Sequence, residues 1–540
     1  MKQNRWLGLV IISMAVSIVI IDGTIVNTIF PAIIQDLALS STQVQWVQES
    51  YVLVFAALLL IWGSLADQIG RRRLLLIGIV IFVIASVWAG QTTSGDQMIL
   101  ARVVQGIGGS MVLPTTLALV NATFQGKERA IAFGIWGATI GGMVAVGPVL
   151  GGWLATDFSW RWAFLINLPI GIVIALGLLL FVPESKSDQV RGLDIVGALL
   201  SVVLFASLVF GLIEGRIYGW WDQNPDKQFE LFGQVWPAGW ISIIPLALVI
   251  AVLSTWAFIW WELKRAKAQK PVILDLGLLG ITSFRNGSIA ALIISMGEFG
   301  LLFAIPLWLQ NVLGLSPISS GLVLLWLAGG AFLASGLTGM LSGKLSPTRA
   351  VQIGVLLELV GVAGVGIFAS PETGWVPLAP LLFIYGIGVG LATAQLTGVI
   401  MVDVPNDQSG QASGSQSTVR QVGSALGIAV LGTMLFSGTE LTLRQELQSL
   451  ELDRSQQVLI VDQVVESSGG AIAGLSAQLE PELGSELSGQ IEKAANDAFT
   501  QGAKWSAWAA TGFLILGFFS TLKLGRTSAR KDSERQPLVD

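Results

Sequence analysis

Residues 63–73 read Gly-Ser-Leu-Ala-Asp-Gln-Ile-Gly-Arg-Arg-Arg, a short polar stretch between two long apolar segments. A helix of about 20 mostly apolar residues crosses the bilayer core, which is about 30 Å thick, and the flanking segments 43–62 and 74–90 approach that length. Residues 63–73 are therefore predicted to form a loop at the membrane surface. Three consecutive arginines indicate the cytoplasmic side, because Lys and Arg accumulate in short inner loops.

The composition places the whole chain in the same class. Of its 540 residues, 53% are hydrophobic and only 12% are charged. These values exclude an ordinary soluble protein and predict an all-α polytopic membrane protein, whose first partner is the lipid bilayer. The net charge of −5 says nothing about nucleic acid, and no nucleic-acid partner is expected.

The residue types that are missing limit the chemistry. The sequence contains no Cys and no His, which excludes disulfides, thiol chemistry and a His-based metal site. Any proton relay must then use Asp or Glu. No G-x-x-x-x-G-K-[ST] stretch and no nucleophile–base constellation is visible, so we expect neither an enzyme nor transport driven by nucleotide hydrolysis. No metal and no cofactor is expected.

Fourteen apolar segments have the length and composition of membrane-spanning helices. Most of the 30 Lys and Arg residues fall in segments that are cytoplasmic if the N-terminus is inside. The first segment carries Asp22 and lacks a small-residue cleavage site, so we expect a retained helix and not a signal peptide. The segments are residues 7–30, 43–62, 74–91, 97–121, 130–153, 161–182, 193–214, 239–261, 287–310, 318–341, 350–370, 375–402, 414–437 and 504–523.

Three segments lie outside these spans. Residues 215–238 form an expected outer loop whose tryptophans suit the membrane interface. Residues 438–503 are rich in Glu, Gln and Ser and are predicted to form short amphipathic helices that lie over the outer face, where they could contact a partner. The tail after Leu524 is polar and basic and is predicted to be cytoplasmic and disordered.

Three charged residues fall at a similar depth in the first half of the chain. Asp22, Glu49 and Arg102 each lie inside a predicted span, where a charge on an isolated helix costs about 3 kcal/mol or more. They could form one cluster that carries a charge of −1 when fully ionised and becomes neutral on binding one proton. We expect a role in proton coupling, with a purely structural ion pair as the alternative.

A second set of candidates lies later in the chain. Glu298 falls near the middle of its predicted span, with Phe299, Phe303 and Trp308 close in sequence. A carboxylate among aromatic rings suits a lipophilic cation, so these residues are expected in a substrate cavity. The alternative is that Glu298 faces a polar cavity without touching substrate. Glu358 is a weaker candidate of the same kind, and Glu214 is expected to reach water at the outer end of its helix.

Glycine and charge positions suggest moving parts. Asp67 ends one span and could meet the positive N-terminal end of another helix, and Arg71 could pair with a carboxylate. The span 130–153 carries small residues four positions apart around Pro148, which favours close packing and a kink. The expected gating and hinge residues are Gly63, Asp67, Gly70, Arg71, Arg72, Gly147, Pro148, Gly151 and Gly152.

These motifs together resemble one known family. Residues 63–73 are similar to the G-x-L-a-D-r-x-G-r-[RK] signature of the major facilitator superfamily. Four further stretches resemble signatures of its fourteen-helix drug/proton antiporter branch, in the first, fourth, fifth and thirteenth spans. They are Ile-Asp-Gly-Thr-Ile-Val-Asn-Thr-Ile-Phe-Pro at 21–31, Arg-Val-Val-Gln-Gly-Ile-Gly-Gly at 102–109, Gly-Pro-Val-Leu-Gly-Gly at 147–152 and Val-Arg-Gln-Val-Gly-Ser-Ala-Leu-Gly at 419–427.

The resemblance implies a major facilitator fold with 14 transmembrane helices. Two six-helix bundles would occupy residues 1–182 and 272–540, and two inserted helices with their loops would occupy residues 183–271. The second bundle would include the outer loop 438–503 and the tail. A substrate cavity would lie between the bundles near the membrane midplane.

Two positions depart from the family's pattern. The second-half counterpart of the opening loop, residues 339–347, lacks an acidic residue. Trp326 stands where the family often has proline. Both differences leave open how symmetric the gating of the two halves is.

The sequence thus favours a proton-coupled antiporter that exports small amphipathic or cationic drugs from the cytoplasm by alternating access. Protons and small molecules would be its substrates, the proton gradient its energy source, and the plasma (inner) membrane its location, with both termini cytoplasmic. Asp22 is the preferred proton carrier because, unlike Glu49, it lies in a family-like motif. The alternatives are a specific exporter of a metabolite, lipid or native antibiotic, and a non-transporting membrane sensor or scaffold.

Overall fold

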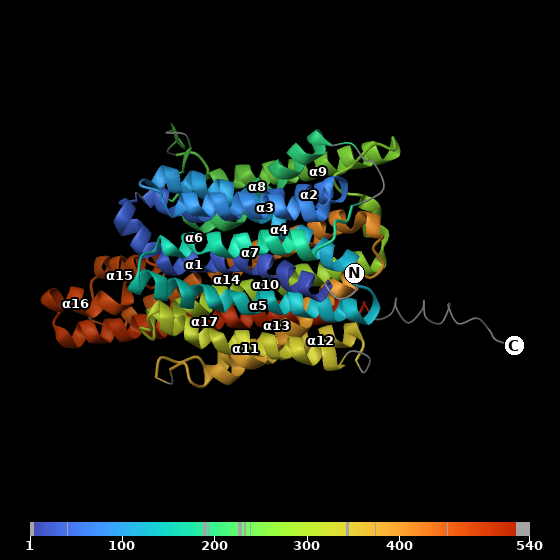
Figure 1. The fold of residues 1–540 in the computed structure, drawn as a ribbon. Helices are drawn as coiled ribbons and strands as arrows, with labels where there is room; N and C mark the ends of the chain where they lie inside the picture. The colour runs from blue at the N-terminus through green and yellow to red at the C-terminus, as the bar shows by residue number, and fades with distance from the viewer. Residues whose placement is uncertain are drawn as a thin grey trace.

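The computed structural model of the protein is almost entirely helical. It describes residues 5–39, 41–186, 192, 194–224, 229–231, 234–237, 239–341, 345–372, 374–450 and 452–524. The long helices lie roughly parallel and side by side, and one group of helices projects beyond the others at one end (Figure 1). The described strands are β1 (Glu230–Leu231) and β2 (Gln234–Val235), a small antiparallel pair that joins Glu230 to Val235 in the predicted outer loop.

The first half of the chain forms one packed group. Its fourth helix contacts the first, second and third, and its fifth helix packs along the first. The helices are α1 (Arg5–Leu37), α2 (Ser41–Ile69), α3 (Arg71–Ala89), α4 (Gly95–Thr123), α5 (Gly126–Asp157), α6 (Trp162–Leu165) and α7 (Asn167–Phe181).

Two helices follow that belong to neither group. α8 (Ile195–Tyr218) and α9 (Ile243–Lys267) pack on each other, and α8 also contacts α2 and α14 (Ser409–Leu447). Large apolar side chains such as Val252 and Leu253 remain exposed on α9. In a bilayer such a surface faces lipid, which is as apolar as the side chains themselves.

The second half builds a comparable group. α13 packs on α10, α11 and α12, and α17 packs on α10, α12 and α14. Besides α14, its helices are α10 (Thr282–Asn311), α11 (Pro317–Leu341), α12 (Pro347–Phe368), α13 (Leu378–Met401), α15 (Arg454–Glu466), α16 (Ile472–Leu483) and α17 (Ser485–Thr521), with short 3₁₀ helices η2 (Leu276–Gly280) and η3 (Asn406–Gln408).

The described helices include fewer long apolar segments than the 14 membrane spans that the sequence predicts. Within the described residues, 11 helical segments are long and apolar enough to cross a membrane, and shorter apolar segments lie in α5 (Val146–Ala155) and α11 (Ile318–Ala334). The expected count of 14 is therefore not confirmed, whereas an all-helical membrane protein with about 11 to 13 spans is. α17 is not among these segments, and its first half carries Glu486, Glu492 and Asp497.

The segment 438–503 contains the two short helices expected there, α15 and α16. α14 and α17 are 39 and 37 residues long and continue into this segment, where α15 packs against α14 and α16 packs against α17 (Figure 1). The reason is apolar burial, since Leu443, Ile460 and Phe499 are fully buried. The tail from residue 525 onward lies outside the described residues.

Glycines bring helices of the two halves into backbone contact. A Cβ atom at Gly63 of α2 would lie 2.5 Å from the carbonyl oxygen of Gly410 and 2.6 Å from the Cα of Gly414, both on α14. Small residues allow such an approach without side chains between the helices. This crossing joins the end of α2 to the beginning of α14.

The helix α5 makes the second contact between the halves. Gly142 lies against Phe332 and Gly152 against Ile318, both on α11. Gly147 and Gly151 instead face α1, where a Cβ atom at Gly151 would lie 2.7 Å from the Cγ1 of Ile25. α5 is continuous through Pro148. Gly142 and Gly152 thus pack toward the second half of the chain, and Gly147 and Gly151 pack toward the first half.

Replacing Gly63 tests the first of these contacts. We expect Gly63→Ala to lower the stability of the detergent-purified protein by about 1–3 kcal/mol, because the added methyl group meets backbone atoms that cannot rotate away. Thermal unfolding followed by circular dichroism measures this. Gly512→Ala on α17 is the matched control, since a Cβ atom there meets nothing within 4 Å. Equal unfolding temperatures for the two variants would contradict the packing.

Candidate functional site

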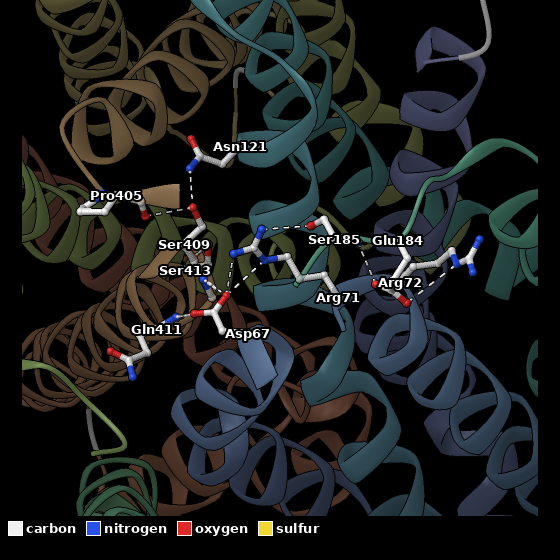
Figure 2. Close-up of polar contacts among 11 residues, drawn as sticks. Asp67, Arg71, Arg72, Asn121, Glu184, Ser185, Pro405, Ser409, Gln411 and Ser413 are labelled. Carbon is white, nitrogen blue, oxygen red and sulfur yellow. Dashed lines mark hydrogen bonds and ion pairs between the residues drawn. The ribbon is translucent and has the colours of Figure 1, made fainter. Parts of the chain in front are cut away.

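The carboxylate of Asp67 lies between two helices. It accepts hydrogen bonds from the backbone N–H groups of Gly410 (2.8 Å) and Gln411 (3.0 Å), at the beginning of α14 (Figure 2). It also binds the guanidinium of Arg71, whose Nη2 is 2.7 Å from its Oδ1. A carboxylate is stabilised at a helix N-terminus by the unpaired N–H groups and the helix dipole. Asp67 therefore holds α2 against α14.

Arg71 is itself fixed from a third direction. Its Nη1 donates to Ser185 Oγ (3.0 Å) and its backbone N–H donates to the Ser185 carbonyl (2.9 Å) (Figure 2). The Arg71 side chain is 2% exposed. The segment after α7 thus braces the arginine that binds Asp67.

Glu184 is a residue of this cluster that sequence reasoning missed. Its two carboxylate oxygens accept hydrogen bonds from the backbone N–H groups of Arg72 (3.0 Å) and Arg73 (3.1 Å), which lie in the first turn of α3. Gly70, with φ of 111°, leads into this turn, and a Cβ atom there would lie 2.7 Å from the Glu184 carboxyl carbon. A side chain at Gly70 would therefore be strained and would collide with the cap. The ion pair between the Arg72 side chain and Glu184 is long, with 3.9 Å between Nε and Oε2.

A further polar contact joins the halves beside Asp67. Asn121, near the end of α4, donates to the Ser409 hydroxyl at 2.9 Å (Figure 2). Both side chains are buried. The beginning of α14 is thus held by α2 and α4 together.

Asp22 and Arg102 form a buried ion pair in the first half. The Arg102 Nη1 lies 2.7 Å from the Asp22 Oδ2, and the two residues are 2% and 1% exposed. Gln105 bridges them, because it accepts from Arg102 and donates to Asp22 Oδ1, both at 2.7 Å. The guanidinium also lies 4.2 Å from the ring centre of Tyr51, a cation–π distance.

Asn167 of α7 also belongs to this cluster. It donates to Asp22 Oδ1 (3.3 Å) and to Ser86 Oγ (2.9 Å). The side chain of Glu49, the expected third member, lies outside the described residues. Gln105 belongs to the same motif as Arg102 and could have been suspected from it, whereas nothing local to Asn167 or Tyr51 indicates their part.

A second buried acid lies in the other half. Glu298 of α10 is 3.5 Å from the Nη2 of Arg420 on α14, and its Oε1 accepts from Thr393 on α13 at 3.1 Å. Tyr385 of α13 donates to the Glu298 carbonyl oxygen at 3.2 Å. Asp22 on α1 and Glu298 on α10 thus stand on the first helix of each half, each beside an arginine.

Glu358 of α12 lies behind this cluster. It is 0% exposed, and among the described residues neither carboxyl oxygen has a hydrogen-bond partner. Glu214 on α8 is also buried at 2% exposure, so the expectation that it reaches water at its helix end is wrong. α8 packs on α9, α2 and α14, so its helix surface is covered by neighbours from several directions.

The aromatic residues near Glu298 in sequence separate in space. Phe299 is half-buried, and Phe303 packs edge-on against Phe436 of α14. Trp308 is buried and donates to Thr500 of α17 at 3.0 Å. Phe303 and Trp308 therefore contact α14 and α17 farther along α10, beyond the partners of the Glu298 carboxylate. Among the described residues, no group of acidic side chains could hold a metal ion.

Comparison with known proteins agrees with this architecture. The family model described as Major Facilitator Superfamily matches residues 12–212 and 192–428. Among solved structures, the human organic anion transporter MFSD10 has a TM-score of 0.58 at 12% identity and covers 95% of this chain and 98% of its own. A bacterial proton:xylose symporter, XylE, has a TM-score of 0.56 at 13% identity, with 87% and 96% covered. At such identities these structures show the fold alone.

Curated relatives are closer in sequence. The multidrug resistance protein Stp of Mycobacterium tuberculosis is 31% identical over 469 residues, 87% of this chain and 83% of that protein. The probable actinorhodin transporter of Streptomyces coelicolor is 32% identical over 441 residues, with 80% and 73% covered. The multidrug efflux pump LfrA of Mycolicibacterium smegmatis is 30% identical over 433 residues, with 80% and 81% covered. The chain therefore belongs to the Major Facilitator Superfamily, as a multi-pass membrane transporter of its drug efflux and resistance families and not an enzyme.

Proposed function

We propose that this protein is a proton-coupled antiporter that exports small amphipathic or cationic drugs from the cytoplasm by alternating access. The observation that carries the proposal is the buried Asp22–Arg102 pair, 2.7 Å apart and enclosed by Gln105, Asn167 and Tyr51. An acid inside a transporter's membrane region is expensive to bury and is a typical carrier of a proton. The chain has no histidine to take that role.

The proposed membrane arrangement has fourteen spans. α5, α11 and α17, which are 32, 25 and 37 residues long, add to the 11 apolar segments. The N-terminal bundle (1–182), the inserted pair (183–271) and the C-terminal bundle (272–540) then follow, in the cytoplasmic membrane. Both termini are cytoplasmic and the segment 438–503 is outside, in line with the arginines of residues 71–73.

Proton exchange at Asp22 would act through Arg102. Ionised Asp22 neutralises the guanidinium, and a proton on Asp22 removes that attraction and leaves Arg102 only Gln105 and the Tyr51 ring. The pair joins α1 to α4, so its strength biases how these helices pack. Glu49 remains a proposed third member, through which the ionised cluster would carry a charge of −1.

The contacts of Asp67 would form the cytoplasmic gate. They tie α2 and α14, which belong to opposite halves, at the end where residues 71–73 lie. The conformation described here is then closed toward the cytoplasm. Opening requires Asp67 to leave the α14 N-terminus. On α5, Pro148 and Gly152 lie against α11 at the second contact between the halves, whereas Gly147 and Gly151 lie against α1. We propose that these four residues form the hinge.

Glu298 would meet cationic substrates. Its contact with Arg420 is 3.5 Å, longer than the 2.7 Å of the Asp22–Arg102 pair, and Arg420 is 17% exposed. A lipophilic cation could compete with this arginine for the carboxylate, and the half-buried Phe299 adds a ring beside it. Phe303 and Trp308 lie farther along α10 than Glu298, so in this proposal they would line a more distant part of the substrate cavity.

A specific antibiotic exporter is the second candidate. The tetracenomycin C resistance and export protein of Streptomyces glaucescens and the puromycin resistance protein of Streptomyces alboniger are both 31% identical to this chain, over 81% of its length. Uptake of a panel of cationic dyes and neutral antibiotics into inverted vesicles separates the two candidates. Broad dye uptake supports the multidrug exporter, and uptake of one compound class supports the specific one.

Asp22→Asn should abolish pH-gradient-driven export and keep substrate binding, because the amide cannot carry the proton. Ethidium accumulation in inverted vesicles with an imposed pH gradient measures export, and fluorescence in detergent measures binding. Asp36→Asn on the same helix is the matched control, since Asp36 is half exposed and its hydrogen bond from Arg161 holds the pKa of its carboxyl below the usual range. If Asp22→Asn still concentrates ethidium on the pH gradient alone, Asp22 is not the essential carrier.

Glu298→Gln should weaken ethidium binding about tenfold, or about 1.4 kcal/mol. The affinity for a neutral lipophilic compound should change by no more than about twofold. The loss follows from the missing charge, since Gln fills nearly the same volume. Fluorescence titration in detergent gives both affinities, with the exposed pair partner Glu440→Gln as control. Equal losses for both ligands would assign Glu298 to structure or to coupling.

Asp67→Asn should impair transport without impairing insertion, because the α2–α14 contact loses its charge. The cysteine-free sequence allows a direct readout, since Asn121→Cys and Ser409→Cys place two thiols where side chains now meet at 2.9 Å. Their cross-linking rate should fall several-fold in the Asp67→Asn background. Asp96→Asn, an exposed acid in the first turn of α4, is the control. Unchanged cross-linking and transport would refute the gate.

A further inference from the structure

Glu358 is enclosed with almost no polar neighbours of its own. It lies on α12 against α13, where a Cβ atom at Gly388 would be 2.5 Å from the Glu358 backbone nitrogen and 2.8 Å from its Cγ. The residue is 0% exposed, and neither carboxyl oxygen has a hydrogen-bond partner among the described residues. An ionised carboxylate without a partner is costly to bury, and bound protons remove that cost.

The charged groups that act on Glu358 come from two other helices. Glu298 of α10 repels its ionised form and Arg420 of α14 attracts it, and the phenol of Tyr385 on α13 interacts with both carboxyls. Tyr385 also donates to the Glu298 carbonyl oxygen. The last helix packed on α12 is α17, which is uncharged from Trp505 to Thr521. Two acids and one arginine thus share one enclosed space.

The two acids are not equivalent. Glu298 is 3.5 Å from Arg420 and accepts a hydrogen bond from the Thr393 hydroxyl, and both contacts stabilise its ionised form. Neither carboxyl oxygen of Glu358 has a hydrogen-bond partner among the described residues, so Arg420 attracts it only without direct contact. Fully ionised, the three groups carry a charge of −1, and a single proton makes them neutral. Interacting carboxyl groups titrate as a unit. A proton shared by the two acids is better held by Glu358, whose buried carboxyl oxygens lack hydrogen-bond partners among the described residues.

We propose that Glu358 is a second site for a transported proton, which it holds while enclosed and exchanges through Glu298. The inference rests on the proposed antiport. Arg420, at 17% exposure, is the most accessible member of the cluster, so exchange occurs on its side. A cation bound at Glu298 adds positive charge beside the pair, which favours release of the Glu358 proton. Substrate and proton thereby compete in the second half.

This second site changes the charge that each cycle moves. With one proton at Asp22 and one at Glu358, about two protons enter for each monovalent cation exported, so one positive charge moves inward. With Asp22 alone the exchange is electroneutral. A membrane potential by itself therefore drives export in the first case and does not in the second.

The experiment compares two driving forces in inverted vesicles with ethidium as substrate. One is a pH gradient, and the other is a lumen-positive potential set by potassium and valinomycin. We expect the wild type to respond to both and Glu358→Gln to keep the pH-driven accumulation but lose at least tenfold of the potential-driven accumulation. Glu358→Asp, which retains a carboxyl group, should recover it, and Glu440→Gln should match the wild type.

The outcomes separate this inference from the proposed function. Potential-driven accumulation that is equal in Glu358→Gln and the wild type overturns the second site and leaves the antiport standing. A wild type that ignores the pH gradient overturns the proposed function itself.

A second measurement holds even if Glu358→Gln fails to fold. The infrared difference spectrum of the purified wild type, recorded on ethidium binding, should lose the carbonyl band of a protonated carboxylic acid. In Asp22→Asn the change that remains belongs to the second half. Its absence in that variant overturns the inference.

Discussion

A charge inside a membrane needs a partner, and this protein's architecture follows from how it supplies partners. Arg102 could not remain buried at 2% exposure without Asp22, and Asp22 in turn needs Gln105 and Asn167 to satisfy its oxygens. The cost of a lone charge at this depth is about 3 kcal/mol or more. The partners come from α1, α4 and α7, so the cluster joins three helices. In the proposed antiport, a proton that binds Asp22 would weaken this junction and change how the three helices pack.

The proposed gate depends on the same electrostatic pairing of a buried charge. Asp67 is stabilised by two N–H groups of α14 and by Arg71, and the backbone contact at Gly63 brings the helices close enough for these bonds. Glu184 caps α3 and thereby fixes the arginine's helix. The inserted α8 contacts both α2 and α14, so it lies against the two helices that the gate joins.

Much of this could be predicted from local sequence, and the remainder depends on distant contacts. The apolar segments, the burial of Asp22 and Arg102 and the readiness of Asp67 to bind a helix end follow from composition and spacing. The predicted surface loop 63–73 was wrong, because residues 63–69 belong to α2 and residues 71–73 to α3, and Gly70 alone lies between the two helices. Asn167, Glu184 and Tyr51 act only because folding brings them to residues far away in the chain. Glu214 and Glu358 show the same limit, since their burial depends on which helices cover them. The sequence predicts short helices in the segment 438–503, but its amphipathic pattern does not reveal that α14 and α17 continue into it.

The central claim is that a proton gradient supplies the energy through buried carboxyl groups. Purified wild-type protein in liposomes tests it most directly, with ethidium outside, an acidic lumen and no other solute gradient. The account predicts that ethidium accumulates in the lumen above its outside concentration and leaks back when nigericin collapses the pH difference. Accumulation that survives nigericin, or none while the gradient is intact, would contradict it.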